Sequence, residues 1–177
     1  MHPVELSQLT AIVEVLAPRV CLEWGSGGST REMLERFPFI ERYVSVEHHG
    51  EWADRVRGLV QDPRLELHHV PADQPLAAGA SRKEQIAWDA EAERKPELLR
   101  SYVERPASLG QTFDFVLVDG RARCFCLKAG FEFLRQGGII VLHDAQRPEY
   151  HEAVRALGRA VFLEPWHQGQ ICLVRKA

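Results

Sequence analysis

The chain has 177 residues, of which 45% are hydrophobic and 27% are charged, and its formal net charge at pH 7 is -3. This length and apolar content predict a single globular domain over residues 1–177 with a full hydrophobic core. A chain without a basic field does not bind nucleic acid strongly and nonspecifically, so we expect no nucleic-acid partner.

Sorting signals and cysteine spacing indicate the compartment. The amino terminus lacks a charged-then-apolar signal region, and no run approaches the roughly 18 apolar residues of a membrane span. The four cysteines lack zinc-ligand spacing and are interpreted as reduced core residues: Cys21, Cys124, Cys126 and Cys172. We therefore expect a cytoplasmic protein with no membrane partner, and a homo-oligomer stays open.

A helix, a buried strand and a glycine-rich bend open the chain. Apolar residues recur at helical spacing from Glu5 to Leu16, which predicts a helix that Pro18 ends. The short apolar run Val20–Leu22 predicts a strand inside a parallel sheet. The bend Glu-Trp-Gly-Ser-Gly-Gly-Ser-Thr, residues 23–30, then leads into a helix over Thr30–Arg36. Open α/β folds bind ligands at such bends.

The bend is informative in what it contains and in what it lacks. Gly25, Gly27 and Gly28 let a ligand approach the main chain closely. The dinucleotide fingerprint needs a glycine where Thr30 stands, and no lysine follows as in a phosphate-binding P-loop. The carboxylate of Glu23 would repel a pyrophosphate, and it suits a ligand with a cationic head.

A second predicted strand, Tyr43–Glu47, also ends in an acid. Glu47 lies about twenty residues beyond Gly27, where a mononucleotide-binding unit places the carboxylate that binds the ribose. One carboxylate can accept hydrogen bonds from both ribose hydroxyls at once. The alternative is that Glu47 only caps the next helix, which is predicted over Glu51–Val60 with Trp52 facing inward.

The third predicted strand covers Leu65–Val70. His68 and His69 point to opposite faces of a strand, so they cannot chelate a metal together and are interpreted as structural. Asp73 follows the strand in a Pro-Ala-Asp bend.

Residues 74–112 depart from the regular alternation of strands and helices and predict a helical insertion in the domain. Helices are expected over Ser81–Arg94 and around Glu97–Val103. A long insertion is either a functional cover, with Trp88 and Tyr102 lining a substrate entrance, or a solvated decoration, and both interpretations stay open.

Two further strands end in chemically active residues. The clearest strand in the chain, Phe113–Val118, ends at Asp119, and a fifth strand over Ile139–Leu142 is followed by His143 and Asp144. The carboxyl ends of parallel strands meet at one edge of a sheet. These three side chains are therefore expected to converge.

The Glu-x-Gly-x-Gly pattern of residues 23–27 resembles motif I of the class I S-adenosylmethionine-dependent methyltransferases, with Ser29 in place of the family's third glycine. The runs Ser-Val-Glu and Val-Asp-Gly-Arg-Ala-Arg also look like a small bacterial branch of methyltransferase-like proteins. The resemblance covers nearly the whole chain and implies a Rossmann-like α/β fold. Its seven-stranded, mostly parallel sheet would have the order 3-2-1-4-5-7-6, with helices on both faces. The antiparallel last strand would close a hairpin of Ala160–Leu163 and Ile171–Arg175, joined by Glu164–Gln170.

The resemblance also implies S-adenosyl-L-methionine as the cofactor. Glu23 would serve the methionine ammonium, Glu47 the ribose, and Asp73 the adenine amino group. The residues expected at the cofactor are Glu23, Gly25, Ser26, Gly27, Glu47, His48, Asp73 and Asp119.

Three roles are open for the tips of the fourth and fifth strands. His143 is the best base by its intrinsic pKa, with Asp119 and Asp144 orienting it or acting as the base themselves. A divalent metal held by Asp119 and Asp144, as in the catechol-type branch of the family, is a second option. We do not favour it, because His-Asp replaces the usual Asp-Asn pair. Alternatively, the side chains only satisfy backbone donors at the strand ends.

Arg121, Arg123 and Arg147 lie near the same tips in the sequence. Guanidinium groups recognise carboxylate or phosphate bidentately, which predicts an anionic acceptor; surface ion pairs are the alternative. We predict methyl transfer to a small-molecule acceptor, more often at oxygen than at nitrogen. The rival functions are a non-catalytic subunit that binds the cofactor or a partner, and a nicotinamide-dependent oxidoreductase.

Overall fold

The computed structural model describes residues 1–165 and 169–177. One seven-stranded sheet has the order β3-β2-β1-β4-β5-β7-β6, and β7 runs antiparallel to both β5 and β6. This arrangement confirms the predicted fold class. The strands are β1 (Val20–Trp24), β2 (Arg42–Glu47), β3 (Leu65–His69), β4 (Phe113–Val118), β5 (Leu134–Leu142), β6 (Ala160–Phe162) and β7 (Cys172–Arg175).

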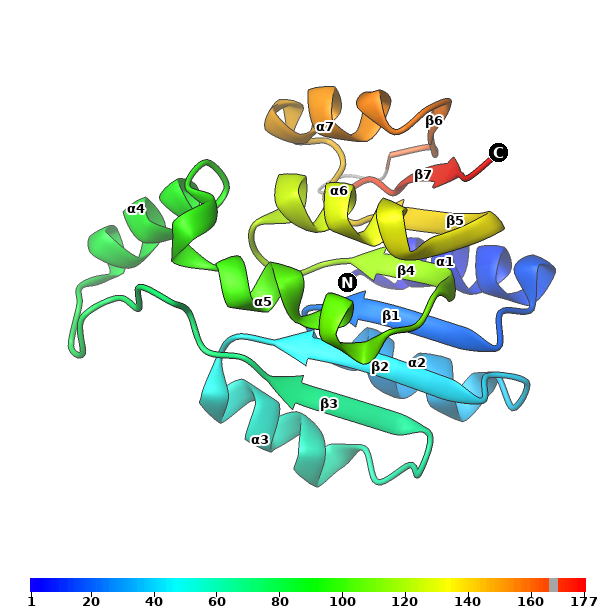
Figure 1. The fold of residues 1–177 in the computed structure, drawn as a ribbon, viewed down its shortest axis with the longest axis horizontal. Coiled ribbons are helices and arrows are strands. Elements are labelled where there is room, and N and C mark those ends of the chain that lie inside the picture. Colours follow the sequence, from blue (N-terminus) through cyan, green and yellow to red (C-terminus); the bar gives the residue numbers. More distant parts are fainter. Residues whose placement is uncertain (166–168) are drawn as a thin grey trace.

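Helices cover both faces of the sheet (Figure 1), as expected of a largely parallel sheet whose strands are buried on both sides. On one face, Leu9 and Met33 pack with Tyr43 of the sheet. On the other face, Leu127 packs with Trp24. The α-helices are α1 (Pro3–Leu16), α2 (Gly28–Arg36), α3 (Gly50–Leu59), α4 (Arg82–Ala92), α5 (Arg100–Glu104), α6 (Arg123–Phe133) and α7 (His151–Ala156); the 3-10 helices are η1 (Pro96–Leu98), η2 (Arg105–Leu109) and η3 (Pro148–Tyr150).

Helix α1 begins at Pro3, slightly before the predicted start, because His2 caps it. The His2 Nδ1 atom accepts the N–H of Val4 at 3.3 Å, and the N–H of His2 donates to Oε2 of Glu5 at 3.1 Å. This reciprocal capping box fixes the first turn. It also fixes Glu5, whose side chain is buried.

The helical insertion is more broken than predicted. Ser81 caps α4, but the second predicted helix, around Glu97–Val103, is divided into η1 and α5 at Leu99, whose φ of -136° is not helical. Tyr102, predicted at a substrate entrance, is fully buried. Its carbonyl accepts the indole N–H of Trp24 at 3.1 Å, so this part of the insertion belongs to the core.

Strand β5 begins at Leu134, earlier than the predicted Ile139. Gly137, expected in a turn, has a φ of 81°, and the register between β4 and β5 shifts in this region. The strand therefore bends instead of starting after a turn.

The predicted connection Glu164–Gln170 includes residues 166–168, which lie outside the described residues. Within the described part of the chain, no helix combines the length and the apolar character needed to cross a membrane.

Candidate cofactor and acceptor site

The loops after β1 and β4 touch at the centre of the sheet's carboxyl edge. β1 has β2 on one side and β4 on the other, which is the switch point where open α/β sheets bind ligands. Gly25 has a φ of 93°, and a Cβ there would lie 2.6 Å from the backbone N of Gly120. Only glycine permits this backbone-to-backbone approach.

Glu23 lies beneath the bend and has no exposed surface. Its carboxylate accepts the hydroxyls of Ser29 and Thr30, both at 2.5 Å, and that of Ser45 at 2.9 Å. Burial raises the pKa of Glu23 to about 7, although the three hydroxyl groups oppose the shift. Glu23 thus anchors the first turn of α2 from below. This placement differs from the predicted direct contact with a ligand's ammonium group.

Glu47, at the end of β2, is joined to the same bend. Its Oε2 accepts the N–H of Ser26 at 3.1 Å and the hydroxyl of Ser26 at 3.3 Å. Its Oε1 accepts the N–H of His49 at 2.9 Å and lies 3.2 Å from Nδ1 of His48. Burial raises the pKa of Glu47, but these histidine contacts outweigh it, so the pKa is below its ordinary value. The carboxylate is therefore ionised and held in place at neutral pH.

Trp52 covers the outer side of the bend, a role that the sequence did not indicate. Its indole N–H donates to the carbonyl of Ser26 at 2.6 Å, and a Cβ at Gly27 would lie 3.7 Å from its ring. The ring is 40% exposed, so it does not face inward as predicted. Trp52 holds the bend against α3.

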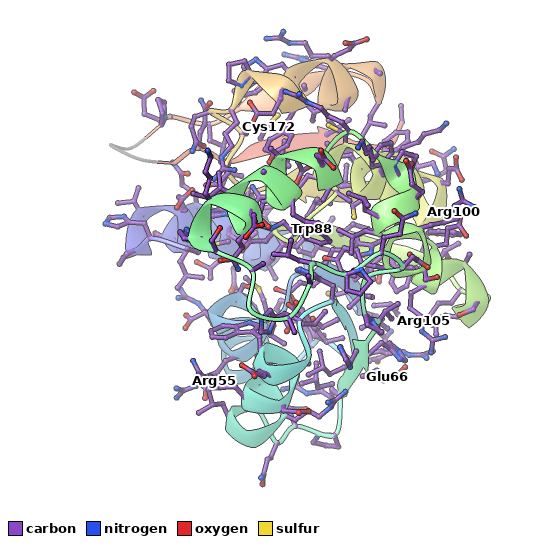
Figure 2. All side chains as sticks on the ribbon, turned by 90° about the vertical axis from the view of Figure 1, so that its left-hand side faces the viewer. Arg55, Glu66, Trp88, Arg100, Arg105 and Cys172 are labelled. Atoms are coloured by element: carbon purple, nitrogen blue, oxygen red, sulfur yellow. The ribbon has the colours of Figure 1, made fainter. Side chains whose placement is uncertain are left out.

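A cavity of about 520 Å³ opens beside the tip of β2, between the loops after β2 and β3 and the insertion. The ring of His48 lies nearly parallel to that of Trp88, at 15° and with 6.2 Å between centroids. Figure 2 looks toward this side of the molecule, where Trp88 lies beneath α4. We call this cavity the β2–α4 pocket; it is lined by His48, His49, Gly50, His69, Pro71, Ala72, Pro75, Leu76, Ala77, Gly79, Ala80, Gln85, Trp88, Asp89 and Arg121.

Of the predicted site residues Arg121 and Asp73, only Arg121 lines this pocket. The Nη2 atom of Arg121 lies 2.8 Å from Oδ2 of Asp89 on α4. Asp73 is outside the lining, and its carboxylate instead accepts the N–H of Ser101 at 2.9 Å and the hydroxyl of the same residue at 2.5 Å. His69, interpreted as structural, lines the pocket.

The tips of β4 and β5 converge as predicted, with His143 at the centre. Its Nδ1 lies 2.5 Å from Oδ1 of Asp119 and 3.8 Å from Oδ1 of Asp144, while its Nε2 lies 3.0 Å from Oε1 of Glu5. Burial alone would lower the pKa of His143, but the three carboxylates outweigh it and hold the pKa above its ordinary value. The carboxylates around His143 therefore favour the protonated form of its ring.

Arg123 joins the two tips from inside the protein. Its guanidinium donates to the carbonyl of Gly120 at 2.9 Å, to the carbonyl of His143 at 2.7 Å and to Oδ2 of Asp144 at 3.0 Å. The residue is only 4% exposed. This placement differs from the prediction that Arg123 faces a substrate. Arg123 is the first residue of α6, and Ala122 before it has a positive φ of 54°.

A metal fits this edge poorly. Glu5, His143 and Asp144 each offer a ligand atom within 4.8 Å of the others, and such a donor set can bind a transition metal. However, Oδ2 of Asp144 already lies 3.0 Å from Nη1 of Arg123 and 3.1 Å from Nη2 of Arg147. A divalent cation would stand beside two guanidinium groups, at a high electrostatic cost.

Comparison with known proteins identifies the fold. No protein-family model matches the chain, and no curated protein matches it in sequence. Among solved structures, an O-methyltransferase from Bacillus cereus in complex with SAH is 15% identical, with a TM-score of 0.65 over 99% of this chain and 82% of that one. The O-methyltransferase TomG from Streptomyces achromogenes, in complex with SAM, is 15% identical, with a TM-score of 0.63 over 100% and 82%. A methyltransferase-like protein from Silicibacter pomeroyi is 23% identical, with a TM-score of 0.62 over 100% and 88%.

The chain has the class I methyltransferase fold. Within this fold, the structure gathers the predicted residues into two groups. Gly25, Ser26 and Gly27 lie with Glu47 around the bend, and the second group consists of Asp119, His143, Asp144, Arg123 and Arg147.

Sequence reasoning missed Glu5 in the second group of the methyltransferase fold. In the sequence it served only to mark the start of the predicted first helix. The one available signal was that a Glu three residues after His2 matches the capping-box spacing, which pins the side chain near the helix start.

Proposed function

We propose that the protein transfers a methyl group from S-adenosyl-L-methionine to a small-molecule acceptor, at an oxygen atom. The observation that carries this proposal is the coupling between Glu47 and the glycine bend at the switch point of a methyltransferase fold. Solved structures of similar fold hold SAM or SAH. The β2–α4 pocket adjoins Glu47 and is large enough for a nucleoside.

The contacts of Glu47 suggest how it would take up a ribose. A carboxylate accepts about four hydrogen bonds, and here four contacts within the chain occupy it: three are hydrogen bonds, and the fourth is the 3.2 Å approach of Nδ1 of His48. Two come from the backbone amides of Ser26 and His49, which hold the carboxylate in place. The other two come from the side chains of Ser26 and His48, which can rotate away. We infer that the ribose hydroxyls replace these two side chains.

Other residues would complete the cofactor site. Gly25 and Gly27 would lie beside the amino-acid tail, and Asp119 would lie near the sulfonium end. Glu23 would act indirectly, by anchoring the helix that follows the bend. Aromatic faces bind bases by stacking, so His48 and Trp88 would border the adenine. When bound, the cofactor supplies an electrophilic methyl group.

His143, Asp119 and Asp144 would act on the acceptor. An acceptor hydroxyl must lose its proton as the new carbon–oxygen bond forms. His143 can accept that proton only if Glu5 first releases Nε2 and the ring gives up the proton there. With Glu5 in place, the imidazolium would instead stabilise an acceptor that arrives as an anion, and Asp119 would orient the ring.

The anionic character of the acceptor rests on two arginines. Arg121 lines the β2–α4 pocket and Arg147 is partly exposed beside Asp144; Arg123 is no longer a candidate. Binding of matched neutral and anionic acceptor analogues to Arg121→Ala tests this point. A selective loss for the anionic class supports the proposal, and an equal loss for both classes contradicts it.

A non-catalytic, cofactor-binding protein is the second candidate function. It is favoured by the pairing of each acid at the acceptor edge with a cation of the same chain. Such a protein would bind the cofactor without turnover. Incubation with methyl-labelled S-adenosylmethionine and a panel of hydroxylated acceptors distinguishes the two, because only an enzyme produces S-adenosylhomocysteine and a labelled product.

Calorimetry tests the cofactor itself. We expect S-adenosylmethionine and S-adenosylhomocysteine to bind and NAD not to bind, which would exclude the oxidoreductase. Glu47→Gln removes charge-assisted hydrogen bonds worth about 1.5–3 kcal/mol, so the Kd should rise roughly 10- to 100-fold. Glu51→Gln, an exposed change on the neighbouring helix, is the matched control. Absence of binding by the wild-type chain would refute both candidate functions.

A further inference from the structure

One face of the sheet lacks a cover at its β7–β6 end. Val174 and Cys172 of β7 are buried on the face that packs against α6 and α7. Leu173 points to the opposite face, as does its register partner Val161 on β6. Val161 is 42% exposed, and in residues 1–165 and 169–177 no helix lies over it. Sheets of this class normally bury both faces.

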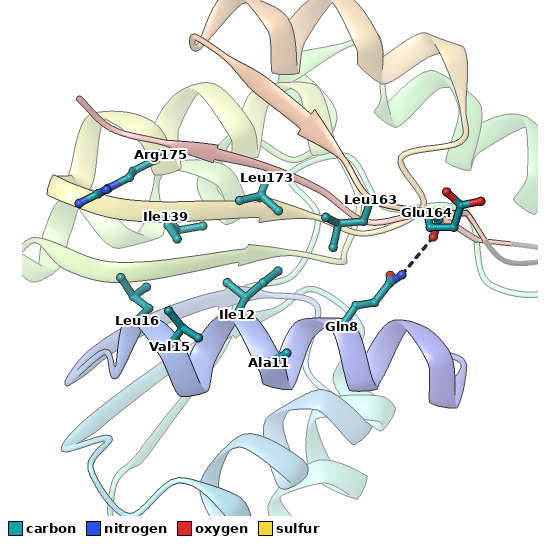
Figure 3. A pocket seen from close by; sticks show the side chains of 10 residues that line it. All are labelled: Gln8, Ala11, Ile12, Val15, Leu16, Ile139, Leu163, Glu164, Leu173 and Arg175. Carbon is teal, nitrogen blue, oxygen red and sulfur yellow. Dashed lines mark hydrogen bonds between the residues drawn. The ribbon is translucent and has the colours of Figure 1, made fainter.

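Helix α1 borders the open face and forms one wall of a groove of about 630 Å³ (Figure 3). Ile12 and Leu16 of the helix face Ile139 and Leu173 of the sheet across this groove. Val15 stands beside them and is 89% exposed. The groove is therefore apolar along its length and has an apolar ridge on its rim.

The outer surface of α1 carries an apolar stripe of its own. Val4, Ala11 and Val15 recur at helical spacing on the side away from the core, and all three are exposed. A solvated helix face normally carries charged side chains instead. The helix thus has one stripe for its own core and a second stripe without a partner in the described residues.

The two ends of the groove carry opposite charges. Glu164 lies at one end, beside Gln8, which donates to the Glu164 carbonyl at 3.0 Å. Arg175 lies at the other end (Figure 3). A surface with a carboxylate at one end and a guanidinium at the other is complementary to its own copy after a two-fold rotation. Each Glu164 then meets the Arg175 of the second copy.

We propose that this groove binds a second copy of the same chain, with α1 packed against α1 in antiparallel orientation about a two-fold axis. The ridge at Val15 of each copy fills the groove of the other. The Glu164–Arg175 pairs at the two ends set the orientation. The proposal does not depend on methyl transfer, and it leaves the β2–α4 pocket, on the carboxyl edge of the sheet, open in both copies.

Analytical ultracentrifugation of the full chain over a range of concentrations tests the dimer. The wild type should show twice the monomer mass. Val15→Glu should weaken self-association by roughly tenfold or more, because it places a charge within the apolar contact. Its circular dichroism spectrum should match that of the wild type, since Val15 is 89% exposed in its own chain. The matched control is Leu59→Glu on α3, an exposed leucine far from the groove, which should dimerise normally.

Reversing the charges at the two ends of the groove distinguishes this two-fold dimer from a dimer formed through any other surface. Glu164→Arg and Arg175→Glu should each weaken the homodimer, because like charges then meet at both ends. An equimolar mixture of the two variants should associate again, because every pair in the mixed dimer has opposite charges. A monomeric wild type at all concentrations would overturn the proposal. So would a dimer that is insensitive to Val15→Glu, or single variants that do not recover on mixing.

Discussion

The Nε2 atom of His143, at the end of β5, lies 3.0 Å from Oε1 of Glu5 in the first turn of α1. The opposite ring nitrogen lies 2.5 Å from Oδ1 of Asp119. Carboxylates therefore flank the ring at both of its nitrogens, and together they raise the pKa of His143. The amino-terminal helix is thus joined electrostatically to the tips of two central strands.

Glu5→Gln should lower the pKa of His143, because one of the carboxylates that stabilise the imidazolium is removed. In the wild type this pKa is raised, so the stabilisation is complete below the unfolded-state pKa of about 6.5 and is lost as pH rises through the folded-state pKa. In the variant the loss should be smaller and should be complete at a lower pH, because only the folded-state pKa moves. NMR titration of the His143 ring, with denaturation curves across this range, measures both effects.

His143→Gln is the reference for this experiment, since it should remove the part of the pH dependence that comes from this ring. An unchanged His143 titration in Glu5→Gln would mean that Asp119 and Asp144 alone set its charge. The contact with α1 would then be only a packing contact.

Glu23→Gln should reduce the pH dependence of folding stability in a pH range below the one that His143 affects. Burial raises the pKa of Glu23 to about 7 from an ordinary value of 4.5, so between these values the folded state binds a proton that the unfolded state lacks. Wild-type stability should therefore fall as pH rises through this window, by an amount on the order of 3 kcal/mol. Urea denaturation of both proteins at several pH values gives the difference curve. A difference that does not change with pH would contradict the raised pKa.

The strand order and the two site groups could be predicted because their signals are local. Glu47 and Asp119 each end a short apolar run, and the bend between Glu23 and Thr30 can be recognised from its glycines alone. Parallel topology then brings the strand ends to one edge without any knowledge of side-chain contacts.

The direction of individual side chains could not be predicted, since it depends on contacts between distant segments. Arg123 lies inside because its guanidinium binds the carbonyls of Gly120 and His143, which come from two different strand ends. Tyr102 is core because the broken insertion packs on the sheet. Glu5 meets His143 only after the first helix has docked on the sheet. Each of these is a tertiary effect on a residue whose local sequence did not indicate its partners.

Gly25→Ala should destabilise the fold by at least about 3 kcal/mol, because it combines backbone strain with a steric clash. The φ of 93° is unfavourable for alanine, and the new Cβ would lie 2.6 Å from the backbone of Gly120. Gly28→Ala is the matched control: no atom lies within 4 Å of its Cβ position, and alanine in a helix gains about 0.5–1 kcal/mol over glycine. Thermal denaturation compares the two. Equal effects on the two variants would mean that the loops after β1 and β4 can move apart without a loss of folding stability.

Arg123→Met should cost about 3–5 kcal/mol of folding stability, the typical penalty for removing one partner from a buried ion pair. The loss would leave Asp144 with fewer partners and the carbonyl of His143 without its donor at 2.7 Å. Arg147→Met removes a guanidinium from the same carboxylate, but the Arg147 side chain is 44% exposed. Its loss should therefore cost only about 0–1 kcal/mol. Chemical denaturation of both variants at neutral pH measures the contrast. If the two costs were equal, Asp144 would be held mainly by its own backbone and not by the buried guanidinium, and the tips of β4 and β5 would keep their separation without Arg123.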